Sequence, residues 1–381
     1  MRPARVSRGA GRAGPDGRRS RCARFRRRGQ ARTTPLTRTR HITAAVSAVC
    51  DDHGMSTRDF WHLQDWNDPA SVRARLAGGE SPTARYRSCG ETPLHLAAAA
   101  GAAEAVTAML AYTREVDIPD ERGRTPLWWA VEHLQEKTVR LLLEAGADAW
   151  RPCVGAWTPG RLALTTDLAP LVEGMPGAVP LTVAQRAEQA RADRLIGVFS
   201  AEKIHTEGLG VTFTDVLGEE EVIRRLGADP AKCPVFQQDS EMDQMDLFDA
   251  VGNYAVGVTG TALGCIISQP FWNALDDDEL ARRLAPATTY SLFFNPKGGT
   301  SGTLYRDGTE VRHEEIGSLT PFADDPPEHW LYRFWQQPCM PFPHGDANLL
   351  AYACAMGGIT KATGRDCWAL SRGPRRIVRC R

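Results

Sequence analysis

The pattern of apolar residues divides the chain into two unlike parts. Between about residues 90 and 175, apolar side chains recur at helical spacing, as in Val106, Met109 and Leu110, and small residues and turns separate these segments. This spacing predicts short amphipathic helices. From about residue 205, segments rich in Val, Thr and Ile, such as 210–216, are bounded by Gly-containing turns and predict strands.

A period of 33 residues runs through the first part. The pair Thr92-Pro93 recurs as Thr125-Pro126 and as Thr158-Pro159. Threonine is suited to cap the start of a helix, and proline fits its first position, where no N–H is needed. The period therefore predicts one helix beginning at each pair, with Gly123 in the turn before the second.

The segments around these pairs, Gly90–Ala98 and Gly123–Val131, carry a T-P-L-H-x-A pattern or a close variant of it. Over about residues 58–175 the chain resembles the ankyrin-repeat family. The resemblance implies an all-α solenoid of about three to four repeats, with a degenerate first unit around 60–76 and a truncated last one after Pro159. It also implies a structural, hydrogen-bonding role for His95.

In that family, the turn tips and the exposed face of each first helix form a concave surface that binds another protein. The resemblance implies that this chain, too, has a protein partner. Carried over by register, the expected partner-binding residues are Glu91, Glu121, Arg122, Arg124, Trp129, Glu132, His133, Trp157, Thr165 and Thr166. Arg and Trp among mixed charges are a composition typical of binding hot spots.

A Gly- and Pro-rich boundary follows the repeats, and we assign 176–204 to a linker and a capping helix that begins after Thr182. Residues 205–365 are predicted to form an α+β domain with a mainly antiparallel sheet, a turn at Asp307-Gly308 and helices at 327–336 and 346–356. Residues 366–381 are predicted to form a basic tail. The α+β region contains a strand, an E-E-V-x-R-R-L-G helix at 220–227, a strand pair and a hairpin with F-x-N at 293–295. In this layout it loosely resembles an uncharacterised actinobacterial domain, which implies no known activity.

The sequence offers little catalytic chemistry. It has no G-x-S-x-G, H-E-x-x-H or Walker A motif, and His313, His329 and His344 have no spacing that pairs them. The acids between Asp239 and Asp249 lack the order of a calcium loop, and turn chemistry explains Lys297. We predict no catalytic residue, metal or cofactor. The alternative to a protein-binding module with an α+β domain of unknown role is that the C-terminal domain is an enzyme or a small-molecule sensor. The repeats would then deliver this domain to a target.

Charge separates residues 1–54 from the rest of the chain. This head has 14 Arg or Lys against 3 Asp or Glu, whereas the whole chain has 46 of each. Its composition predicts a disordered segment. Three interpretations stay open: a start misassigned upstream of Met55, a transit peptide, and a basic arm for nucleic acid, which requires that the head be translated.

The ten cysteines are scattered and include no C-x-x-C pair, which favours a cytoplasmic setting. The chain has no run of 18 apolar residues, so we expect no membrane-spanning helix.

Overall fold

A computed structural model describes the chain in several ranges. These are residues 65–85, 89–202, 204, 206–236, 255–270, 277–295, 299–316, 321, 323–336, 346–371 and 375–379. The expected head at 1–54 and the segment Phe60–Leu63 lie outside these ranges.

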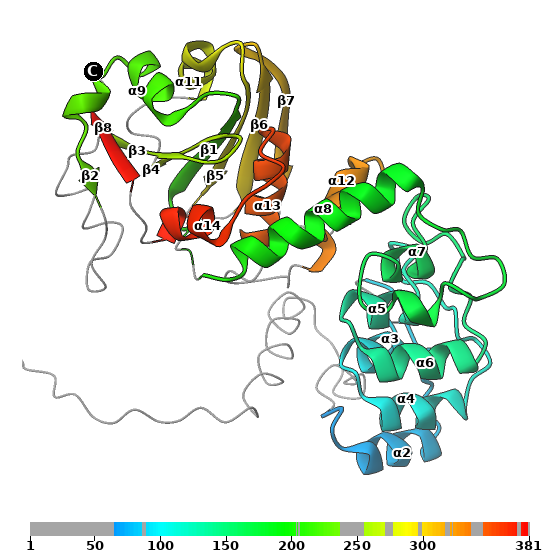
Figure 1. The fold of residues 1–381 in the computed structure, drawn as a ribbon. Helices are drawn as coiled ribbons and strands as arrows, with labels where there is room; N and C mark the ends of the chain where they lie inside the picture. The colour runs from blue at the N-terminus through cyan, green and yellow to red at the C-terminus, as the bar shows by residue number, and fades with distance from the viewer. Residues whose placement is uncertain are drawn as a thin grey trace, which may run out of the picture.

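The first part is a stack of short helices in two columns (Figure 1). One column, here called the inner column, contains the helices that begin at the Thr-Pro pairs: α3 (Pro93–Ala99), α5 (Pro126–Glu132) and α7 (Pro159–Ala163). The outer column contains α2 (Pro69–Ala77), α4 (Ala103–Leu110) and α6 (Glu136–Glu144). A single 3-10 turn, η3 (Ala169–Leu171), replaces an outer helix after α7, as the truncated last unit predicts.

The three inner helices begin as the sequence predicts. The side chains of Thr92, Thr125 and Thr158 each accept a hydrogen bond from the backbone N–H three residues further on. Each cap is followed directly by proline. The threonine thus satisfies one of the N–H groups that the first turn of a helix leaves without a partner.

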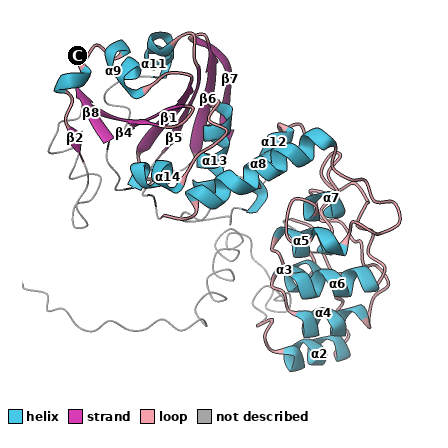
Figure 2. Ribbon diagram, in the orientation of Figure 1, coloured by secondary structure: helices cyan, strands magenta, loops and turns pink. Residues whose placement is uncertain are grey.

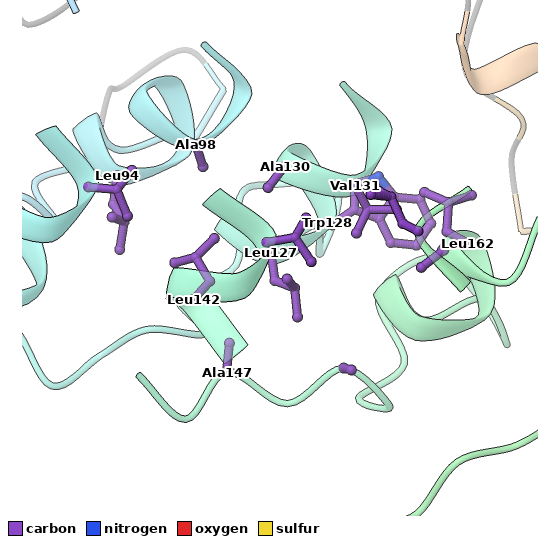
Figure 3. Packing of buried hydrophobic residues seen from close by; sticks show 14 of the residues in the cluster. Leu94, Ala98, Leu127, Trp128, Ala130, Val131, Leu142, Ala147 and Leu162 are labelled. Carbon is purple, nitrogen blue, oxygen red and sulfur yellow. The ribbon is translucent and has the colours of Figure 1, made fainter. Parts of the chain in front are cut away.

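The core of the stack lies between the two columns. Leu94, Leu127, Val131 and Leu142 are buried there beside small residues such as Ala98 (Figure 3). The small side chains let helices of neighbouring units approach closely, so each unit buries its apolar face against its neighbours in the stack.

The second part is an antiparallel sheet with helices on both faces (Figure 2). The strand order is β2-β8-β3-β4-β1-β5-β6-β7, and each described pair is antiparallel. The strands are β1 (Leu209–Asp215), β2 (Val235–Phe236), β3 (Ala255–Gly260), β4 (Gly264–Pro270), β5 (Thr288–Phe294), β6 (Thr300–Arg306), β7 (Thr309–Ile316) and β8 (Arg375–Arg379).

Helices α9 (Glu219–Arg225) and α11 (Asp277–Leu284) cover one face of the sheet. The other face packs against α8 (Val183–Phe199) and α13 (Asp346–Met356). The α+β architecture is therefore confirmed, and the predicted β6–β7 turn has its two central residues, Asp307 and Gly308, at positive φ.

Three elements differ from the expectation. The basic tail instead contains helix α14 (Gly364–Ser371) and strand β8, which lies between β2 and β3. The helix expected at 327–336 is split into α12 (Pro327–Leu331) and the 3-10 turn η5 (Phe334–Gln336), because Arg333 has a φ of +56°. Helix α8 packs mainly on α13, so the α+β domain, rather than the repeats, buries its apolar face.

Candidate partner-binding surface

Asp120 organises the turn between the first two complete repeats. Its side chain is buried, and its Oδ1 accepts hydrogen bonds from the backbone N–H groups of Arg122 (2.9 Å) and Arg124 (2.8 Å). Its Oδ2 accepts from Arg124 Nε (2.8 Å) and Trp129 Nε1 (3.1 Å). One carboxylate thus fixes both the turn and the two large side chains that flank it.

Arg124 and Trp129 form the centre of the surface. The Arg124 guanidinium carbon lies 4.7 Å from the centroid of the Trp129 ring, and its Nη1 lies 3.5 Å from a carboxylate oxygen of Glu132. The exposed ring of His133 stacks on Trp129 at 6.2 Å. These contacts hold the arginine and the tryptophan in a single arrangement.

The tips of neighbouring turns are joined to each other. The backbone N–H of Glu121 donates to the carbonyl oxygen of Cys89 (3.2 Å), and the Glu121 side chain packs over Gly90. Glu91, one residue later, is half-buried, and that burial raises the pKa of its carboxyl group. The charges of Arg124 and Glu121 both act on the Glu91 carboxyl group, so Glu91 lies near both side chains.

We call this surface the repeat face. It comprises Glu91, Glu121, Arg122, Arg124, Trp129, Glu132 and His133, and Asp120 supports it from below. The exposed tips Glu121 and Arg122 contribute one charge of each sign.

His95 links the first two complete repeats. Its Nδ1 accepts from the backbone N–H of Thr92 (3.2 Å), so its Nε2 carries the proton and donates to the carbonyl oxygen of Arg124 (3.0 Å). Burial lowers the pKa of this histidine to about 4. The structural role that the family resemblance implies matches this geometry.

In the third repeat, another part of the chain covers the expected partner-binding residue Trp157. Trp157 is only 5% exposed, because its ring stacks on Trp330 of α12 at 4.7 Å. Trp330 also meets the edge of Trp128 at 5.8 Å. The register of the repeats predicts that Trp157 lies on the exposed surface. In the structure, α12 of the same chain covers it.

Two further contacts join α12 and its flanks to the third repeat. Arg333 Nη1 donates to the carbonyl oxygen of Thr165 (2.8 Å), and Ala323 lies against the turn at Gly155. Thr165 is buried and Thr166 is half-buried, and both hydroxyls donate to backbone carbonyls of their own repeat. We therefore leave Trp157, Thr165 and Thr166 out of the repeat face.

The outer column bears a shallow groove of about 730 Å³ across α2, α4 and α6. Its charged lining residues are Arg73, Glu104, Lys137, Arg140 and Glu144. These side chains belong to the helices opposite the inner column and provide control positions for tests of the repeat face.

Two of the three isolated histidines, His313 and His329, lie in the described part of the α+β domain. The Nδ1 of His313 lies 2.8 Å from the Thr303 hydroxyl, and the Nε2 of His329 lies 3.0 Å from Glu314, so the two serve separate contacts. Within the described ranges, no three His, Cys, Asp or Glu side chains are arranged to hold a metal ion. Lys297, His344 and the acids of 239–249 lie outside those ranges.

Sequence reasoning missed two residues that shape this region. Asp120 could have been found, because an Asp three residues before the turn glycine is typical of a side chain that caps its own turn. No sequence pattern indicated that Trp330 packs on the repeats, because it lies in a helix of five residues that is far from them in the sequence.

Comparison with known proteins supports the repeat assignment. Residues 64–152 match a family model described as ankyrin repeats in three copies. None of the curated proteins compared with the chain is similar to it.

No helix in the described ranges is long and apolar enough to cross a membrane.

Proposed function

We propose that this protein binds another protein through the repeat face. Ankyrin repeats are generally protein–protein interaction modules, and residues 64–152 carry three of them. The observation that carries the proposal is the network around Asp120, which holds Arg124 and Trp129 together at the solvent boundary. Side chains fixed in advance lose little conformational freedom on binding, and Arg and Trp are enriched among binding hot spots.

The proposed surface spans the first two complete repeats and stops at the third. There, α12 already covers Trp157, so a partner would contact the turn tips at 121–122 and the exposed end of α5 near His133. The scattered cysteine spacing fits a reducing compartment, and we place this interaction in the cytoplasm.

The test is site-specific photo-crosslinking followed by a binding measurement. A photoreactive residue at Glu121 or His133 is expected to capture a partner in the native host, while one at Glu144 in the outer groove does not. The captured protein is then purified and titrated against variants of the full chain.

We expect the Arg124→Ala substitution to weaken binding by roughly ten- to a hundredfold, as removal of a hot-spot side chain does. The double charge reversal Glu121→Arg, Arg122→Glu changes only exposed tips, so it tests the surface without disturbing the core. The control is Arg140→Ala, which removes an exposed charge from the outer column. Equal losses in control and test variants, or capture only from position 144, would contradict the proposal.

A further inference from the structure

The third repeat has an Arg–Trp pair of the same kind as the pair at the centre of the repeat face. In the second repeat, the Arg124 guanidinium lies over the ring of Trp129 at 4.7 Å. In the third, the Arg161 guanidinium carbon lies 4.6 Å from the centroid of the Trp157 ring. Trp157 stands 33 residues after Arg124, so the repeat register places the two pairs at corresponding points of the stack. The third repeat therefore continues the chemistry of the repeat face.

Residues 329–335 of the same chain, here called the cover segment, close off this second pair. Trp330, Leu331 and Trp335 are buried in the core of the repeat stack. Tyr332 and Phe334, which lie between them in the sequence, belong instead to the core around α8 and α13. The cover segment thus has one side for each part of the molecule.

Polar groups bond the cover segment to the α+β domain. The Nε2 of His329 lies 3.0 Å from a carboxylate oxygen of Glu314 on β7. The hydroxyl of Tyr332 donates to Glu188 of α8 (2.9 Å). We therefore expect the cover segment to stay with the α+β domain when its contact with the repeats opens.

The closed contact contains buried donors without acceptors. Within the described ranges, Trp128 Nε1, Trp330 Nε1 and Arg333 Nε are buried and have no hydrogen-bond partner. A buried donor without an acceptor destabilises the closed form, because water would satisfy the same group in the open form. Arg333 also has a φ of +56°, a conformation that is unfavourable for residues other than glycine. These costs offset part of the free energy gained from burying the aromatic rings.

We propose that the cover segment is an autoinhibitory contact, which closes the third repeat until a partner displaces it. The inference rests on the proposed function, because opening extends the same binding surface from two repeats to three. The displacing partner carries a segment of similar chemistry, with an aromatic ring to stack on Trp157 and a basic side chain three residues later. That side chain donates to the carbonyl oxygen of Thr165, as Arg333 does in the closed form. A ligand that binds only the open form shifts the equilibrium toward it.

The test uses a synthetic peptide of residues 326–336, labelled with a fluorophore and titrated against the full chain. In the Trp330→Ala chain, whose cover segment lacks its central ring, the peptide is expected to bind saturably. The wild-type chain should bind it at least roughly tenfold more weakly, because only the open fraction of the molecules is competent. A peptide that itself carries Trp330→Ala should bind neither chain.

Two further substitutions in the repeats, each combined with Trp330→Ala, locate the peptide. Trp157→Ala should abolish peptide binding, because it removes the ring on which the peptide stacks. The control is Arg140→Ala in the outer column, which should leave peptide binding unchanged. The peptide assay needs no external partner, so a lack of capture at Glu121 or His133 would count against the proposed function alone.

Hydrogen exchange tests the opening in the unaltered chain. The indole N–H groups of Trp128 and Trp330 are buried, so they exchange with solvent only when the contact opens. We expect them to exchange faster than the amide groups of β1 and β5, because opening requires less free energy than global unfolding.

Three results would overturn the proposal. The first is indole exchange as slow as that of the β1 and β5 amides, which would mean that the contact opens only on global unfolding. The second is equal binding of the peptide by the wild-type and Trp330→Ala chains. The third is no binding by a Trp330→Ala chain whose sheet amides stay protected. If that variant does not fold, Trp335→Ala, which removes another buried ring of the cover segment, takes its place.

Discussion

Trp330 is the side chain whose removal should separate the repeats from the α+β domain. It belongs to α12, yet it is fully buried and counts among the core residues of the repeat stack. Its ring stacks on Trp157 at 4.7 Å with an angle of 18° between the rings, and it meets the edge of Trp128 at 5.8 Å and 88°. The Trp330→Ala substitution removes both contacts at once.

The expected cost is about 3–5 kcal/mol, which is typical of a buried Trp→Ala change. Each aromatic pair accounts for roughly 0.5–1.5 kcal/mol beyond the apolar area it buries. The remainder comes from the lost burial and from the cavity left between Trp157 and Trp128. The loss should fall mainly on the last repeat, because each unit of a solenoid contacts only its neighbours.

The assay is hydrogen exchange resolved by segment, combined with urea unfolding. In the Trp330→Ala variant, amide protection should fall first in α7 and then in α5, while β1 and β5 keep most of theirs. The matched control is Phe199→Ala, which removes a buried aromatic ring from the core around α8 and α13. That variant should lose protection in the sheet and leave the repeats unchanged.

Two outcomes would refute this reasoning. In one, Trp330→Ala costs less than about 1 kcal/mol, well below the range for a buried tryptophan. In the other, protection falls equally in the repeats and in the sheet. The first would mean that α12 does not stabilise the stack, and the second that the two parts unfold as a single unit.

Three further predictions concern single side chains. Thr125→Ala should cost about 1 kcal/mol in urea unfolding, because it removes a helix cap, and Thr125→Ser should restore most of it. Since the pKa of His95 falls from 6.5 to about 4 on folding, the unfolded chain binds more protons between these values, and stability should drop as the pH falls through that window. His95→Gln should abolish this part of the pH dependence of the unfolding midpoint. Glu314 accepts hydrogen bonds from the hydroxyls of Tyr290 (2.7 Å) and Tyr352 (2.8 Å), so Glu314→Ala should cost roughly 3 kcal/mol by urea unfolding, whereas exposed Glu315→Ala should cost almost nothing.

The repeats could be predicted from the sequence because each unit is determined locally. The caps at Thr92, Thr125 and Thr158 and the apolar spacing of the helices depend on residues within one unit of 33. The α+β strands were predictable for a similar reason, since β-rich segments separated by turns such as Asp307-Gly308 specify hairpins.

Contacts between distant segments were not predictable. Helix α12 is too short to show a periodic pattern, and nothing around Trp330 indicates that its ring stacks on Trp157. Strand β8 follows a helix in an Arg-rich segment that reads as a tail, and only its pairing with β2 and β3 makes it a strand.

The repeat face was partly predictable. Family register placed Arg124 and Trp129 at the solvent boundary, but the bonds that fix them depend on the buried carboxylate of Asp120. Register alone also placed Trp157 there, because it cannot show which part of a surface another segment of the same chain covers.

The position of α12 over the third repeat has a consequence for the synthesis of the protein. Thr165 and Arg333, which hold α12 in place, are separated by 168 residues. At roughly 5–20 residues per second, a ribosome needs about 8–34 s to synthesise that interval. During this time the third repeat has been synthesised but α12 has not, so the ring of Trp157 is not covered by Trp330. The nascent chain is therefore expected to be most dependent on chaperones during the synthesis of its second half.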